Sequence, residues 1–152
     1  MAKALPAASA AAARDASRRA TGIVIPVYLP PGMDTAAGIE LLEDNLAACV
    51  AAVDNPATIC LAADGEDCGA DVVRQLATRH SVDAVVGPRN QGKLHALRLG
   101  MARLRERQDL SWFATIDADG DHFANELVNL VRAGIYARQE RRVGGVHVLG
   151  RR

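Results

Sequence analysis

Three aspartates at alternating positions, Asp117, Asp119 and Asp121, directly follow the short apolar run "SWFATI" (111–116). Carboxylates this close together raise each other's pKa unless a positive charge lies between them. A divalent cation is the commonest such charge, because hard cations prefer oxygen ligands. The pattern therefore indicates a metal site at the end of a buried strand. The alternative is an exposed Asp-rich turn that caps the following helix.

Two familiar carboxylate motifs do not fit this stretch. An EF-hand loop beginning at Asp117 needs Gly at its sixth position and Glu at its twelfth, where this chain has His122 and Val128. A phosphatase-type D-x-D nucleophile opens its catalytic domain, whereas here only residues 122–152 follow the third aspartate. We therefore expect a metal held against a second source of oxygens, such as the phosphates of a nucleotide.

The composition is that of an ordinary globular domain. The chain has 152 residues, of which 49% are hydrophobic and 24% charged, enough for one domain with a real core. Because 18 basic residues balance 18 acidic ones, we expect no nucleic-acid partner. Cys49, Cys60 and Cys68 have no C-x-x-C spacing and indicate reduced thiols. We expect a cytoplasmic protein, either free or at the inner face of a membrane.

The first residues differ from the rest of the chain. Residues 1–20 are rich in Ala and Arg, poor in acid, and without a continuous apolar core. We expect them to form a disordered leader, followed by a single domain over residues 21–152.

From residue 22 onward, short β-rich runs alternate with longer runs of helical periodicity. Strands are predicted at 22–28, 57–63, 83–87, 111–116 and 143–150, and helices at 35–53, 70–80, 92–107 and 124–138. Such alternation predicts an α/β fold, a mostly parallel sheet with helices on both faces. Right-handed crossovers bring the carboxyl ends of the strands to one edge, where ligands bind in open sheets.

Polar residues follow each of the first four predicted strands. Tyr28 follows the first strand, Asp64 the second, "PRNQGK" (88–93) the third, and the aspartates the fourth. Each has a plain structural alternative. Asp64 begins an Asp-Gly turn dipeptide, and Lys93 is also explained as a solvated residue at a helix start. We assign no role to His95, which we expect on a helix surface, or to His122.

Four segments together resemble the nucleotide-binding half of a GT-A glycosyltransferase of the inverting family 2 type. They are "IVIPVY", "DGEDCGADVVRQLA", "NQGKLHALRLGM" and "ATIDADGD", and their order, spacing and strand position agree over residues 22–130. The resemblance implies a nucleotide-diphospho-sugar transferase fold and transfer of a sugar from a nucleoside-diphosphate sugar to an acceptor hydroxyl. It also implies Mn²⁺ or Mg²⁺ as the cofactor.

The resemblance implies two sets of site residues. Those that bind the nucleotide sugar are Pro26, Tyr28, Asp64, Gly92, Lys93 and Asp117. Those that bind the metal are Asp117, Asp119 and Asp121. Pro26 and Tyr28 would line the base pocket, and Asp64 would contact the base or ribose. Asp117 would face both the ribose and the metal.

The chain also departs from the family pattern. Family members follow the first strand with Asn and an acid, whereas this chain continues as "LPPGMD", in which Asp34 is the available acid. Their acceptor half, with its general base, has no counterpart here, so the catalytic residues are unassigned. We expect a truncated domain that self-associates or meets a partner chain supplying the acceptor half. The alternatives are a degenerate domain that binds nucleotide without turnover, and a nucleotidyltransferase.

Overall fold

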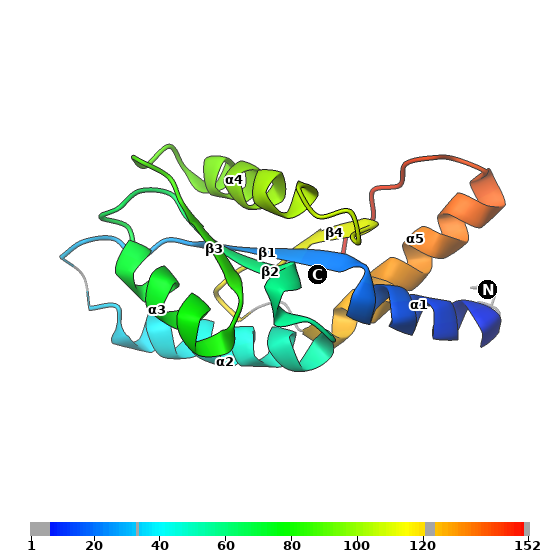
Figure 1. Ribbon diagram of the computed structural model, residues 1–152, viewed down its shortest axis with the longest axis horizontal. Helices are drawn as coiled ribbons and strands as arrows, with labels where there is room; N and C mark the ends of the chain where they lie inside the picture. Colours follow the sequence, from blue (N-terminus) through cyan, green and yellow to red (C-terminus); the bar gives the residue numbers. More distant parts are fainter. Residues whose placement is uncertain (1–6, 33, 121–123, 151–152) are drawn as a thin grey trace.

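The computed structural model describes residues 7–32, 34–120 and 124–150, which build an α/β fold around a parallel sheet (Figure 1). The strands are β1 (Thr21–Val27), β2 (Ile59–Ala63), β3 (Asp83–Val86) and β4 (Trp112–Thr115). Their order in the sheet is β3-β2-β1-β4, and every described pair is parallel. The predicted fold class is confirmed as an α/β fold with a parallel sheet.

Helices cover both faces of the sheet, as the alternation predicted. They are α1 (Ala7–Arg19), α2 (Ala36–Ala52), α3 (Ala70–His80), α4 (Lys93–Arg105) and α5 (Leu127–Arg141). Short 3-10 turns at Pro56–Thr58 and Ala124–Glu126 precede β2 and α5. Figure 1 shows α4 on one side of the sheet and α2 and α3 on the other. No described helix combines the length and the apolarity needed to cross a bilayer.

Alternate residues of β1 supply two separate cores, because successive side chains of a strand point to opposite faces. Ile23 and Ile25 belong to the larger core under α2 and α3, whereas Val24 belongs to the smaller core under α4. The helix α4 lies close to β1 at Gly100, where an added Cβ would come 2.5 Å from Val24 Cγ1. The buried residues of α4 are therefore the small Ala96 and Gly100 together with Leu104.

Leu94 in the first turn of α4 is an exposed apolar residue. This side chain is 80% exposed, because α4 turns its small residues toward the sheet and directs its first leucine outward. Apolar residues occur nearly all round this helix, so spacing alone did not define the buried face.

The direction of strand addition changes between β1 and β4. From β1 the chain adds β2 and then β3 on one side, and α4 then carries it back to β4 on the other side of β1. Ligands of open parallel sheets bind in the crevice outside the carboxyl ends of the strands at such a switch point. The topology thus defines where a ligand cavity is expected.

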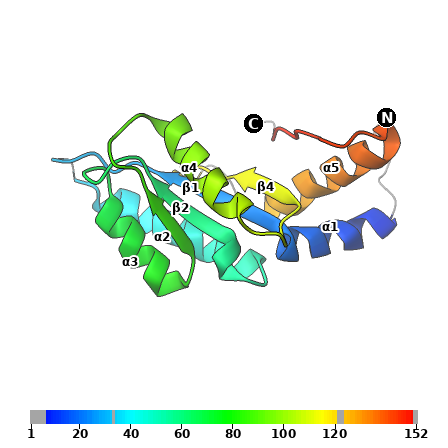
Figure 2. The ribbon, with the colours of Figure 1, turned by 45° about the horizontal axis from the view of Figure 1, so that its top comes forward.

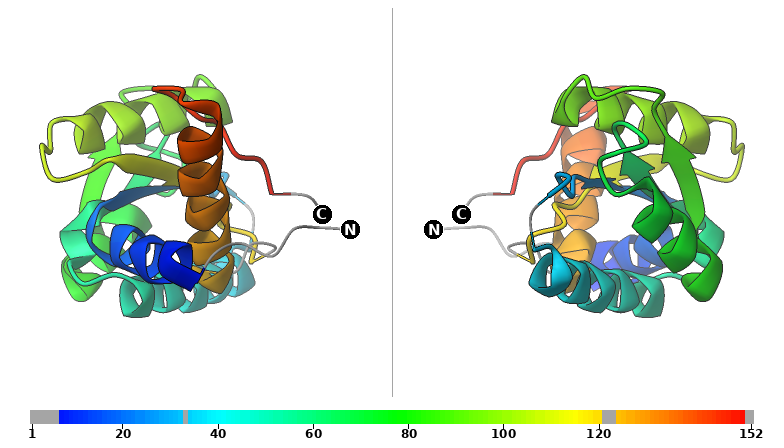
Figure 3. Two further views of the ribbon diagram at one scale, coloured as in Figure 1. Left: turned by 90° about the vertical axis from the view of Figure 1, so that its right-hand side faces the viewer. Right: turned by 90° about the vertical axis from the view of Figure 1, so that its left-hand side faces the viewer.

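The predicted disordered leader is wrong for residues 7–19, which form α1. Figure 2 and Figure 3 show α1 beside α5, where the two helices extend past the sheet. Ala13 and Ser17 are buried, and Asp54 accepts hydrogen bonds from Arg18 Nε at 2.7 Å and Arg19 Nε at 3.0 Å. Alanine has the highest helix propensity. An Ala-rich segment can therefore form a helix and pack against another helix without large apolar side chains.

The predicted last strand at 143–150 is also wrong. These residues are described as irregular chain, and part of this segment lines a groove of about 800 Å³ beside β4 and α5. Gly144 and Gly145 precede the apolar residues and disfavour a strand. Within the described part of the chain, the outer edge of β4 therefore pairs with no strand.

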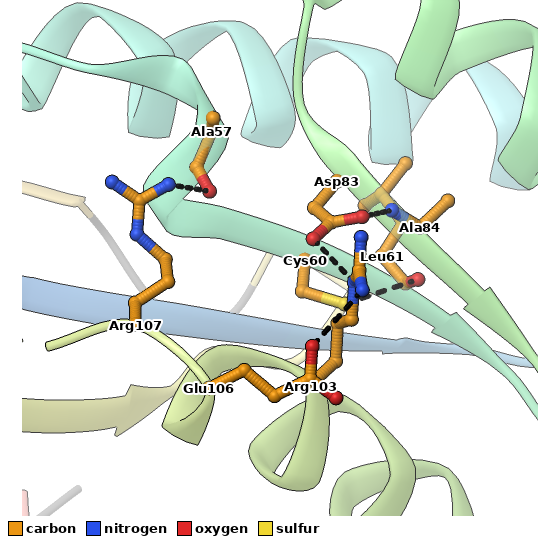
Figure 4. A network of polar contacts seen from close by, with 8 residues as sticks. All are labelled: Ala57, Cys60, Leu61, Asp83, Ala84, Arg103, Glu106 and Arg107. Carbon is orange, nitrogen blue, oxygen red and sulfur yellow. Dashed lines mark hydrogen bonds and ion pairs between the residues drawn. The ribbon is translucent and has the colours of Figure 1, made fainter.

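At the edge of the sheet where the strands begin, ion pairs attach the end of α4 to its neighbours (Figure 4). Arg103 Nε contacts Asp83 Oδ2 at 2.8 Å, and its Nη1 contacts Glu106 Oε2 at 3.1 Å. Arg107 donates to the carbonyl of Ala57 at 3.2 Å. Burial raises the pKa of the nearby Cys60 thiol to about 12, so this cysteine is a core residue and not a nucleophile.

Candidate functional site

A cavity of about 490 Å³ lies at the carboxyl edge of the sheet, at the switch point between β1 and β4. Its lining residues are Pro26, Val27, Tyr28, Asp64, Asn90, Gly92, Lys93, Ala96, Asp117, Ala118 and Asp119. The structure therefore brings all the described candidate residues around one cavity. Asp121 lies outside the described residues. Asp34, the alternative acid after β1, is exposed and is not among the lining residues.

Pro26 lies where β1 and β4 separate. The last paired residues are Val24 and Thr115, and the carbonyl of Val24 then accepts from the Ile116 amide at 3.1 Å. Alternate residues of a strand direct their backbone groups to the same side. The backbone of Pro26 therefore points to the side of β1 on which β4 has already ended. Its missing N–H removes no hydrogen bond between the two strands. Tyr28 follows and is 59% exposed at the rim of the cavity.

Asp64 is a buried carboxylate at the end of β2, only 3% exposed. Its Oδ1 lies 2.5 Å from His95 Nδ1, and its Oδ2 accepts a hydrogen bond from the Gln91 amide at 2.5 Å. Burial by itself would raise the pKa of Asp64, but the hydrogen bonds from His95 and from the Gln91 and Gly92 amides lower it overall. Asp64 is therefore an ionised group with a fixed orientation.

The turn over residues 88–92 packs closely on the end of β2. Gly65 has φ +122°, and a Cβ there would lie 2.9 Å from the backbone nitrogen of Asn90. Gly92 has φ +98° and is the N-cap of α4, and its amide donates to Asn90 Oδ1 at 3.0 Å. Both glycines occupy backbone conformations that other residues rarely adopt. Together with the bonds of Asp64, they position the first turn of α4 beside the cavity.

Sequence reasoning missed the role of His95. The sequence predicts this residue on the helix surface, but its side chain is only 11% exposed. It lies in the first turn of α4 and contacts Asp64 at the end of β2. Its acidic partner lies 31 positions away in the sequence and could not be identified without the fold.

Asp117, which follows β4, is held in a different way. Its Oδ1 lies 2.6 Å from Lys93 Nζ, and the two side chains are 23% and 59% exposed. Its backbone carbonyl accepts a hydrogen bond from Asn45 Nδ2 at 2.9 Å. Asn45 is a buried residue of α2 that sequence reasoning also missed. The backbone at Asp117 is thus fixed, whereas its carboxylate contacts an exposed ammonium.

The described residues fit part of a divalent metal site. They contain no group of three or more His, Cys, Asp and Glu side chains placed to hold a metal. Two carboxylates, Asp117 and Asp119, do line the cavity, and a cationic group already lies against Asp117. Mg²⁺ is commonly bound through one or two carboxylates, with water and substrate phosphates completing its ligands. The pair therefore suits a metal that arrives with a phosphate ligand.

Comparisons with protein-family models, with curated proteins and with solved structures found no match to this chain. The chain is therefore classified by its fold and its cavity alone. The chain is an α/β protein with a parallel sheet and a polar cavity at the carboxyl ends of β1, β2 and β4.

Proposed function

We propose that this chain binds a nucleoside-diphosphate sugar together with Mn²⁺ or Mg²⁺, as the nucleotide-binding part of a GT-A type glycosyltransferase. The reaction is transfer of the sugar to an acceptor hydroxyl. One observation carries the proposal: residues that follow four different strands line a single cavity at the switch point of the sheet. The topology of a parallel sheet brings strand ends together, and the side chains gathered there, an aromatic ring, carboxylates and a lysine, suit a nucleotide and a metal.

The base and ribose fit the side of the cavity that β1 and β2 form. Tyr28 offers an exposed ring for stacking, beside the apolar surface of Pro26 and Val27. The oxygens of Asp64 accept hydrogen bonds from His95 and from the Gln91 and Gly92 amides. Because a carboxylate oxygen accepts more than one hydrogen bond, Asp64 can still accept from a base N–H or a ribose hydroxyl.

The diphosphate fits the first turn of α4. The amides that open a helix lack intrahelical partners and, with the helix dipole, favour an anion. Lys93 adds a positive charge at the same place. A lysine at a helix N-terminus is unfavourable by itself, and a bound diphosphate removes that objection.

Asp117 and Asp119 would hold the metal. When bound, the metal acts as a Lewis acid and stabilises the negative charge that develops on the leaving diphosphate. The acceptor hydroxyl must also lose its proton to a positioned carboxylate, and no described residue is assigned that role. Binding of the nucleotide sugar without turnover is therefore the second candidate function.

A turnover assay distinguishes these candidates. The chain is incubated with Mn²⁺ and a panel of nucleoside-diphosphate sugars, and separately with nucleoside triphosphates and sugar 1-phosphates. Release of nucleoside diphosphate with sugar transfer supports the glycosyltransferase, and binding without release supports the binding domain. Formation of pyrophosphate would indicate a nucleotidyltransferase instead. No binding to any nucleotide sugar would contradict the proposal.

A further inference from the structure

Lys93 has a contact that nucleotide binding alone does not explain. It is the first residue of α4, and its ammonium lies 2.6 Å from Asp117 Oδ1. Its side chain is 59% exposed, so it is not confined by packing. A cation at a helix N-terminus is repelled by the helix dipole, and the carboxylate of Asp117 offsets that repulsion.

The same carboxylate is a ligand of the proposed metal. An ammonium group at this distance from Oδ1 competes with a divalent cation for the negative charge of Asp117. The two positive charges also repel each other when they lie on one carboxylate. A metal that arrives alone must therefore displace Lys93 from an ion pair, with no new anion for the lysine to join.

We propose that Lys93 is a built-in counter-ion of Asp117, which the divalent cation replaces when a diphosphate binds, and that Lys93 then pairs with the diphosphate. This inference rests on the proposed function of the cavity. The movement is short, because the diphosphate lies at the helix end from which Lys93 itself extends. Lysine suits the exchange, since its ammonium is a point charge on a flexible stem that pairs without a fixed geometry.

The exchange makes metal and diphosphate binding cooperative. Before the diphosphate binds, Lys93 lowers the metal affinity. Afterwards, the lysine contributes to diphosphate binding and the carboxylate of Asp117 binds the metal. Coupling of this kind is reciprocal, so the metal must increase the affinity for diphosphate by the same factor.

The test measures Mn²⁺ binding to the full chain by calorimetry and by the electron paramagnetic resonance signal of free Mn²⁺. The wild-type chain is compared with Lys93→Met, first without nucleotide and then with UDP or GDP. Without nucleotide, Lys93→Met should bind Mn²⁺ about threefold to tenfold more tightly, because an exposed ion pair and a nearby repulsion are removed. Addition of nucleoside diphosphate should raise the Mn²⁺ affinity of Lys93→Met by a smaller factor than it raises the Mn²⁺ affinity of the wild type.

Two matched variants complete the design. Arg89→Met removes a positive charge from the same exposed turn, at a position outside the cavity lining, and should leave Mn²⁺ binding at the wild-type level. Lys93→Arg keeps the charge beside Asp117 and should also resemble the wild type when the metal is alone. A gain in Mn²⁺ affinity confined to Lys93→Met supports the exchange.

Other outcomes would contradict the exchange, and they show whether the proposed function fails with it. If wild-type chain binds Mn²⁺ and UDP or GDP together, but Lys93→Met binds Mn²⁺ alone no more tightly, the exchange is wrong and the proposed function stands. An equal gain in Arg89→Met also overturns the exchange, because it reflects net charge. If neither wild type nor Lys93→Met holds Mn²⁺ under any condition, both proposals fail.

Discussion

Two carboxylates that line the cavity, Asp64 and Asp117, are held in opposite ways. Asp64 is 3% exposed, and its own chain occupies both of its oxygens through His95 and Gln91. Asp117 is 23% exposed and is paired with the ammonium of an exposed lysine. The first arrangement fixes a carboxylate as part of the fold, and the second leaves a carboxylate ready to exchange its partner. Changes at Asp64 should therefore alter both stability and ligand binding, whereas changes at Asp117 should alter ligand binding and leave stability nearly unchanged.

The largest expected effect is weaker nucleotide binding in the variant Asp117→Asn. Loss of a charged metal ligand should weaken nucleoside-diphosphate binding in Mn²⁺ by about 100-fold or more, since even changes behind a metal ligand cost about 10–100-fold. Stability should change by less than about 0.5 kcal/mol, because exposed ion pairs contribute little. Calorimetry and urea unfolding measure the two quantities. Asp67→Asn, at an exposed position outside the cavity, is the control. Unchanged binding in Asp117→Asn would remove this residue from the metal site.

Asp64→Ala should lower both stability and nucleotide affinity. It deprives His95 and the Gln91 amide of a buried acceptor, so the free energy of unfolding should fall by about 1–3 kcal/mol. Nucleotide binding should weaken by a similar ~1–3 kcal/mol, while its dependence on metal stays the same. Urea unfolding at neutral pH, followed by calorimetry on the folded variant, tests both effects. If stability and affinity both match the wild type, Asp64 is a turn residue without the role assigned here.

The contrast between these carboxylates also shows what sequence can predict. Short β-branched runs are local signals, so the sheet and the polar residues after β1 to β4 could be predicted before the fold was known. The partners of those residues could not, because His95 and Asn45 meet Asp64 and Asp117 only through tertiary packing.

Local composition also gave wrong structural predictions at both ends of the described chain. The Ala-rich segment 7–19 has no apolar stripe that predicts packing, yet α1 lies against α5. The segment 143–150 has the composition of a strand but no described strand partner. In both cases the structure depends on whether a partner surface is present, and local pattern does not contain that information.

A smaller effect should appear in the pH dependence of stability. Because the pKa of Asp64 is lowered in the folded state, its contribution is fully present above the unfolded value near 3.8. It is lost as the pH falls through the lower folded value. The difference in unfolding free energy between the wild type and Asp64→Asn should thus shrink as the pH falls from 5 toward 2.

The measurement must be this difference, since other carboxyls also change protonation in the same range. Hydrogen bonds from Arg79 and Arg19 lower the pKa values of Glu43 and Asp54, and both groups remain in the two proteins compared. Denaturant titrations at several pH values provide the data. A difference that stays constant down to pH 2 would show that Asp64 is not held as an ionised, hydrogen-bonded group.

The most direct test of the central claim is calorimetric titration of the full chain with nucleoside diphosphates, in Mn²⁺ and again in excess chelator. A nucleotide site completed by a metal on Asp117 and Asp119 predicts binding in Mn²⁺ that weakens by about tenfold or more in chelator, because the diphosphate loses its bridge to the carboxylates. Equal affinity in the two conditions, or no binding in either, would contradict the account.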